Sequence, residues 1–240
     1  LHPTNRRQRQ MCIRDSLETN GKIIKKIALD IKKYAPKAFV ICITNPLDAM
    51  VYVLQKYSKL PKNMCVGMAG VLDSSRMKYI ISDALNVSVN DVETFVLGGH
   101  GDDMVPLINN TTIGGVPLMD FLKLKNFPYS KIEKIVNRTR MGGGEIVKLL
   151  KRGSAFYAPA SSAIQMAEAF LFDQKKLLPC AAFINGQYGL SNMYMGVPTI
   201  IGKKGIEKII EVKLTSKEKL MLKKSVKSVQ GLVSAVDKLL

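Results

Sequence analysis

The sequence predicts an α/β fold in which the C-terminal part of a doubly wound parallel sheet is followed by an α+β domain. Between residues 17 and 70, helical patterns alternate with short apolar runs, an order typical of parallel sheets covered by helices. From about residue 71, this alternation gives way to antiparallel strand patterns and long helices. We therefore predict a partial sheet domain at residues 17–70 and an α+β domain at residues 71–240.

The first part begins with an amphipathic helix from Leu17, which Pro36 ends. We expect one face of this helix to carry Ile23, Ile24, Ile27, Ile31 and Tyr34. The β-branched run at 38–46 is typical of a central parallel strand, and a helix at 47–57 and a strand within 62–70 follow it. Asn45 ends the first strand, and ligands of such sheets bind beyond the carboxyl ends of strands, so Asn45 is expected at a ligand edge.

The second part begins with a helix at 71–85, on which Asp73 and Arg76 lie about one turn apart. The helix is expected to bury a stripe formed by Met77, Ile80, Ile81 and Leu85. A strand at 92–97 then leads into a glycine-rich loop that contains His100. The remaining pattern predicts a strand and turn at 111–118, helices at 130–150 and 156–172, hairpin strands at 180–184, 189–195 and 197–201, and a last helix at 216–239 with Thr215 as its N-cap.

Residues 1–16 differ in character, because they are polar, arginine-rich and without apolar periodicity. We expect them to be disordered or foreign to the domain, with a native basic arm as the alternative. Arg14 and Asp15 precede the segment LETN at 17–20. We assign Arg14 no catalytic role, because the residues before it look foreign to the domain that begins at Leu17.

The formal net charge of +17 could indicate a nucleic-acid partner. The lysines are nevertheless spread along helical segments, aromatic residues make up only 7%, and Trp is absent. A lysine-rich solvated surface is the better interpretation, with no nucleic-acid partner. No apolar run is long enough to cross a membrane, and no signal peptide is evident. The four cysteines lack metal or disulfide spacing, so we expect a cytoplasmic protein without a metal site.

Four side chains could together carry out proton transfer next to an acidic substrate. His100 is the natural proton donor and acceptor, and a carboxylate such as Asp73 would orient its ring. Arg76 could bind a substrate carboxylate through two hydrogen bonds, and the amide of Asn45 could hold a substrate oxygen or a cofactor carboxamide. Spacing alone does not bring these groups together, and a surface ion pair between Asp73 and Arg76 remains an alternative.

Five ordered segments carry a specific resemblance: ITNPLDAMVY at 43–52, GVLDSSRMKYIIS at 70–82, LGGHGDDMVPL at 97–107, SAFYAPASSAIQMAEA at 154–169 and the stretch at 185–211. They resemble the lactate/malate dehydrogenase family, in particular its lactate-dehydrogenase-like malate dehydrogenases. The resemblance implies a Rossmann-type sheet, NAD as cofactor, a homodimer or homotetramer, and interconversion of (S)-malate and oxaloacetate, a step of the tricarboxylic acid cycle. MVP after the histidine and SAFYAP favour malate over lactate.

The resemblance also implies a role for each site residue. His100 would donate and accept the proton, and Asp73 would orient it. The substrate, a small 2-hydroxy or 2-oxo dicarboxylic acid, would contact Arg76, Asn45, Ser154 and Ala155. Asn45 and Asn20 would lie on the cofactor side. No metal is implied.

The family's glycine-rich NAD-binding turn and the acidic residue that follows it are not found in this sequence. We therefore expect a piece that lacks the phosphate-binding half, binds NAD weakly and does not reveal the specificity loop. Two alternatives stay open: an L-lactate dehydrogenase, and a non-catalytic subunit that associates through the helices at 47–57 and 156–172.

Overall fold

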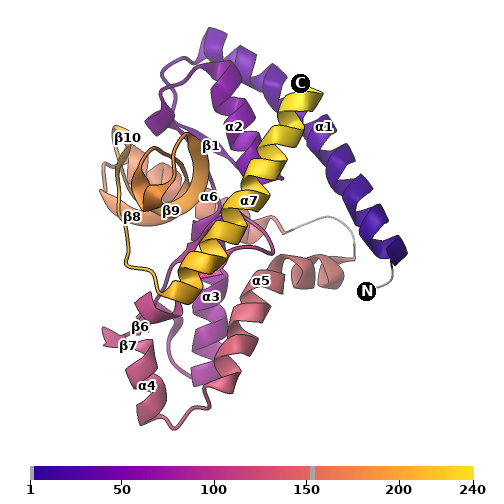
Figure 1. Ribbon diagram of the computed structural model, residues 1–240. Helices are drawn as coiled ribbons and strands as arrows, with labels where there is room; N and C mark the ends of the chain where they lie inside the picture. Colours follow the sequence, from indigo (N-terminus) through magenta and orange to yellow (C-terminus); the bar gives the residue numbers. More distant parts are fainter. Residues whose placement is uncertain (1–2, 152–154) are drawn as a thin grey trace.

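The computed structural model describes residues 3–151 and 155–240 (Figure 1). Its helices are α1 (Pro3–Tyr34), α2 (Leu47–Ser58), α3 (Gly70–Leu85), α4 (Leu118–Leu124), α5 (Ser130–Leu150), α6 (Tyr157–Leu171) and α7 (Ser216–Leu239). Its strands are β1 (Val40–Cys42), β2 (Cys65–Gly67), β3 (Val92–Glu93), β4 (Val96–Leu97), β5 (Val105–Pro106), β6 (Thr112–Ile113), β7 (Val116–Pro117), β8 (Lys176–Ile184), β9 (Met193–Gly202) and β10 (Gly205–Ile209).

The largest sheet has five strands in the order β1-β2-β8-β9-β10. β1 and β2 are parallel, whereas the pairs β2–β8, β8–β9 and β9–β10 are antiparallel. The predicted α/β class, with parallel strands followed by an α+β part, is confirmed. Within the described residues, the run at 38–46, which has the apolar character of a central strand, forms β1 at an edge of the sheet. Both α2 and α6 contact β1, and the ring of Phe170 in α6 stacks on Phe39, which directly precedes the strand.

The predicted strands at 189–195 and 197–201 are one continuous strand, β9. Gly196 lies in the middle of β9 and forms a β-bridge with Gly98. A Cβ added to Gly196 would clash with the backbone of Gly98. This glycine therefore allows a close approach of two backbones and does not form a turn. The predicted strand at 92–97 is instead divided into β3, which pairs with β6, and β4, which pairs with β5.

The first helix differs from the prediction in length and in its buried face. It begins at Pro3, a residue favoured at the first helical position, so residues 3–16 are helical where we expected disorder. Their Arg, Gln and Met residues are good helix formers. The buried face consists of Leu17, Gly21, Ile24 and Ala28, whereas Ile23, Ile27 and Tyr34 are exposed.

This face packs on α2 and α7. Gly21 makes the approach possible, because a Cβ there would lie 3.2 Å from Val236 Cγ2 of α7. In Figure 1, α7 runs diagonally along the molecule and meets α1 near its C-terminal end. The predicted N-cap of α7 is confirmed: Thr215 and Glu218 form a reciprocal capping box.

The predicted apolar stripe of α3, Met77, Ile80, Ile81 and Leu85, is buried. α2 is likewise buried among α1, α7 and the sheet, so it offers little surface for the association with another subunit that we considered. α6 does carry exposed apolar side chains, including Tyr157, Ile164 and Leu171.

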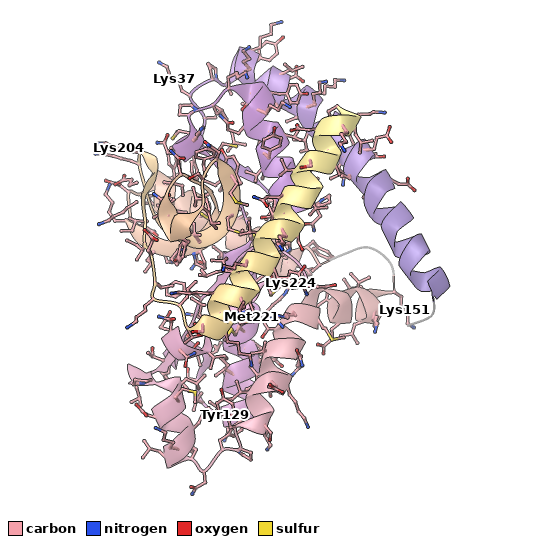
Figure 2. All side chains as sticks on the ribbon, in the orientation of Figure 1. Lys37, Tyr129, Lys151, Lys204, Met221 and Lys224 are labelled. Atoms are coloured by element: carbon pink, nitrogen blue, oxygen red, sulfur yellow. The ribbon has the colours of Figure 1, made fainter. Side chains whose placement is uncertain are left out.

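The surface carries many lysines, such as Lys37, Lys151 and Lys204, which extend away from the ribbon in Figure 2. In the described part of the chain, no helix has the length and apolar character needed to cross a membrane. The described residues also include no group of three His, Cys, Asp or Glu side chains placed to bind a metal ion.

Candidate active site

The site is built around His100, which follows β4 in a loop between α3 and α7. Its ring Nδ1 lies 2.8 Å from Oδ2 of Asp73, in the first turn of α3. Arg76, one turn further along the same helix, donates from Nη1 to the other carboxylate oxygen, Asp73 Oδ1, at 3.2 Å. The Asp73 side chain is only 2% exposed, and those of Arg76 and His100 are 14% and 16% exposed. The structure therefore brings together three residues from two separate segments, in a largely buried cluster rather than a surface ion pair.

The surroundings of His100 act in opposite directions on its pKa. Burial, the largest influence, disfavours the charged imidazolium. The attraction and hydrogen bond of Asp73, together with the charge of Asp48, favour it, while Arg76 disfavours it. The result is a pKa above the ordinary value of histidine. Because Asp73 accepts the Nδ1 hydrogen, Nε2 is the ring atom left to exchange a proton with a substrate.

Arg76 is paired with the Asp73 carboxylate and still has hydrogen-bond donors that are not used. Its Nε is buried without a hydrogen-bond partner among the described residues. α5 packs over this side chain, and a Cβ at Gly142 would lie 3.3 Å from Arg76 Cδ. The glycines at 142–144 are part of the continuous helix α5, and Gly142 lets α5 pack close to the guanidinium. A guanidinium held in this way can bind a substrate carboxylate.

A cleft of about 490 Å³ lies beside His100. It is lined by Pro46 and Asp48 at the start of α2, by the loop from Gly99 to Asp103, and by α7 residues that include Ser225. Asp48 and Ser225 were not predicted as site residues. Asp48 lies two residues after Pro46, in the first turn of α2, but no sequence pattern reveals that this carboxylate faces the histidine loop.

Comparison with known families identifies both parts of the chain. Residues 4–67 match the NAD-binding domain of lactate/malate dehydrogenases, and residues 70–238 match the α/β C-terminal domain of the same family. The chain belongs to the lactate/malate dehydrogenase family. It is therefore a member of a family of NAD-dependent oxidoreductases.

Solved structures of this family include both types of enzyme. The chain is 50% identical to malate dehydrogenase from Cryptosporidium parvum, with a TM-score of 0.92 over 94% of this chain and 72% of that one. It is 47% identical to the lactate dehydrogenase of the same organism complexed with lactic acid and NAD, with a TM-score of 0.89 over 91% of this chain and 69% of that one. For lactate dehydrogenase from Eimeria maxima with NADH and oxamate, the identity is 48% and the TM-score 0.88, over 92% and 69%. Similarity alone does not separate malate from lactate as the substrate.

The family's cofactor can be tested against the residues at the carboxyl end of β1. The Asn45 side chain is exposed there and takes part in no hydrogen bond among the described residues. Asn20 of α1 donates its side-chain N–H to the Asn45 backbone carbonyl at 2.7 Å. The free amide of Asn45 fits the carboxamide end of a nicotinamide, and Asn20 supports the segment that presents it. No G-x-G-x-x-G turn occurs in residues 3–151 or 155–240, so the residues present fit the nicotinamide end of NAD alone.

The remaining predicted site residues lie ahead of α6. Ser154 lies outside the described residues. Ala155 is half-buried and precedes α6 by two residues, and it is not among the residues that line the cleft beside His100. The structure thus joins Asp73, Arg76 and His100 by hydrogen bonds and brings Pro46 and the start of α2 beside His100. Of the predicted site residues, only His100 lines this cleft within the described part of the chain; Asp73, Arg76, Asn45 and Ala155 do not.

Proposed function

We propose that this protein interconverts (S)-malate and oxaloacetate with NAD, and that His100 carries the proton. The observation that supports it most strongly is the hydrogen-bonded cluster of Asp73, Arg76 and His100, which combines a carboxylate-binding group with a proton donor. The similarity to a malate dehydrogenase at 50% identity is consistent with this substrate. The segment MVP after the histidine loop and SAFYAP at 154–159 also favour a dicarboxylate.

In the proposed reaction, bound NAD supplies the chemistry of hydride transfer at the substrate's C2. Arg76 holds the C1 carboxylate and so places C2 and its oxygen beside His100. In oxaloacetate reduction, imidazolium Nε2 gives its proton to the C2 oxygen, and in malate oxidation neutral Nε2 takes it back. Asp73 keeps the hydrogen on Nδ1 and stabilises the charged ring in between. Asn45 would bind the nicotinamide carboxamide and the reacting oxygen.

The test is steady-state NADH oxidation by the native protein with oxaloacetate and with pyruvate. We expect kcat/KM to favour oxaloacetate by about tenfold or more. His100→Asn should lower kcat by about 10²–10⁴-fold, the usual contribution of a general acid. A preference for pyruvate would instead assign the protein as a lactate dehydrogenase. Near-normal turnover by His100→Asn would remove His100 from the proton transfer.

A further inference from the structure

Three consecutive backbone N–H groups in the histidine loop are each held by a different element of the fold. The Gly98 N–H donates to the Gly196 carbonyl of β9 at 2.9 Å. The Gly99 N–H donates to Ser225 Oγ of α7 at 2.8 Å. The His100 N–H donates to Asp48 Oδ2 of α2 at 2.9 Å. The backbone that carries the catalytic ring is therefore fixed from the sheet and from two helices at once.

Asp48 is an unusual choice for one of these acceptors. Its side chain is 2% exposed, and its second oxygen, Oδ1, has no hydrogen-bond partner among the described residues. Burial raises the pKa of this carboxyl to about 6, although the hydrogen bond and the charge of His100 oppose the increase. Burying a carboxylate with one oxygen unpaired destabilises the fold. An uncharged acceptor, such as the neighbouring Ser225 hydroxyl, would hold a backbone N–H without this penalty.

The charge of Asp48 therefore requires a reason beyond holding the backbone, and the groups around His100 supply one. α3 contributes the negative Asp73 and the positive Arg76, and α2 contributes the negative Asp48. α7 contributes the uncharged Ser225 and Val229 to the cleft wall. On the loop itself, Asp103 binds Lys224 and Ser228 of α7. Asp48 is thus a second carboxylate acting on the imidazole, and it comes from a different helix than Asp73.

Close packing keeps this carboxylate in place. A Cβ at Gly99 would lie 3.2 Å from Asp48 Oδ2 and 2.6 Å from Val229 Cγ2. Glycine at this position lets α2 and α7 approach the loop on both sides, so that Oδ2 reaches the His100 N–H.

We propose that Asp48 is a positioning residue for His100: its Oδ2 fixes the His100 backbone, and its negative charge stabilises the imidazolium. The proposal rests on the proposed function, in which His100 carries the proton. Asp73 orients the ring through its hydrogen bond to Nδ1. Asp48 holds the backbone of His100 and favours the charged form of the ring electrostatically. The two carboxylates come from different helices, α3 and α2.

The test is NMR titration of the His100 imidazole in the 240-residue chain, without cofactor or substrate. The sequence has only two histidines, so His2→Gln leaves the His100 signal alone. Asp48→Asn keeps an oxygen acceptor for the backbone N–H and removes the charge. We expect it to lower the His100 pKa by about 1 pH unit, the usual effect of losing a nearby opposite charge. Apart from this change in pKa, the chemical shifts of His100 should be the same as in the parent chain.

Two control variants separate the effect of the Asp48 charge from the effect of the hydrogen bonds that hold the loop backbone. Ser225→Ala removes the acceptor of the adjacent Gly99 N–H and changes no charge, so the His100 pKa should remain as in the parent chain. Asp103→Asn removes a negative charge from the same cleft, but this charge is paired with Lys224, so its effect should be much smaller than that of Asp48→Asn. An unchanged His100 pKa in Asp48→Asn overturns the proposal. So does an equal decrease in Ser225→Ala, which would indicate general loosening of the loop.

The parent chain provides a second measurement that requires no folded variant at position 48. The ¹³Cγ signal of Asp48 should titrate near a pKa of about 6 and shift again as His100 loses its proton. A single carboxyl transition with no response to His100 contradicts the proposal. These measurements use no turnover, so their failure is distinct from a failed oxaloacetate assay. In the active enzyme, Asp48→Asn should shift the loss of oxaloacetate reduction to lower pH by the same amount as the His100 pKa.

Discussion

On the side of the site formed by α3 and the histidine loop, side chains are buried and hydrogen-bonded to one another, whereas at the end of β1 they are exposed and only loosely connected. Asp73 and Asp48 are each 2% exposed and are both hydrogen-bonded to His100, and Arg76 is hydrogen-bonded to Asp73. Asn45 has a free, exposed amide, supported by a single bond from Asn20 to its backbone. One region is preorganised by the chain, and the other presents groups to a ligand.

This difference follows from the chemistry each region must perform. A proton donor must keep one ring orientation and a pKa suited to its task, and low-dielectric surroundings strengthen the charges that set both. Two of the four buried side-chain atoms without a partner in the described part of the chain, Asp48 Oδ1 and Arg76 Nε, belong to this region. Unpaired buried groups destabilise a fold, so their concentration beside His100 is typical of a functional site.

The strongest way to break the comparison is Asp73→Asn. The amide keeps the shape of the side chain but can hold the imidazole in the wrong tautomer, and it removes the partner of both Arg76 and His100. We expect kcat/KM for oxaloacetate to fall by about 10³-fold or more in steady-state assays of the native protein. The loss should persist at every pH assayed, because a change in pH cannot restore the ring orientation. If lowering the pH restores full activity, Asp73 affects the pKa of His100 alone.

Gly142→Ala tests whether the packing of α5 positions Arg76. The new Cβ would lie 3.3 Å from Arg76 Cδ, and a displaced guanidinium should raise KM for oxaloacetate by about tenfold with a smaller change in kcat. Gly144→Ala is the matched control, because a Cβ there meets nothing within 4 Å. Both changes should raise helix propensity by about 1 kcal/mol, so only the contact with Arg76 differs. Equal KM values in the two variants would show that α5 does not position Arg76.

Much of this architecture could be predicted from local sequence patterns. The capping box of α7 and the stripe of α3 depend on spacing within one helix, and both are confirmed. Asp73, Arg76 and His100 could be singled out because their residue types suit one reaction. The spacing of these residues could not show that they lie within hydrogen-bond distance, because that contact depends on how α3 packs against the histidine loop.

The features that were mispredicted depend on partners distant in the sequence. The isoleucines of α1 suggest one buried face, but the contact with α2 and α7 selects Leu17, Gly21 and Ala28 with Ile24. Gly196 resembles a turn residue until Gly98 is found against it. Asp48 resembles an ordinary acidic residue in the first turn of a helix, a position that also favours a carboxylate through the helix dipole.

The smallest expected effect is that of Asn20→Ala, on the exposed side of the site. It removes the 2.7 Å hydrogen bond to the Asn45 carbonyl. A solvent-accessible bond of this kind contributes about 0.5–1.5 kcal/mol, which denaturant unfolding can measure. Thr19→Ala is the control, because Thr19 is exposed on the same helix and its replacement brings a similar gain in helix propensity. The difference between the two variants isolates the bond to Asn45.

Turnover by Asn20→Ala should fall by only a few-fold, because water can replace the lost donor at an exposed carbonyl. A loss as large as that of Asp73→Asn would contradict the division of the site into a preorganised region and a ligand-dependent one. It would mean that the end of β1 is held as strictly as His100, through a bond that solvent can reach.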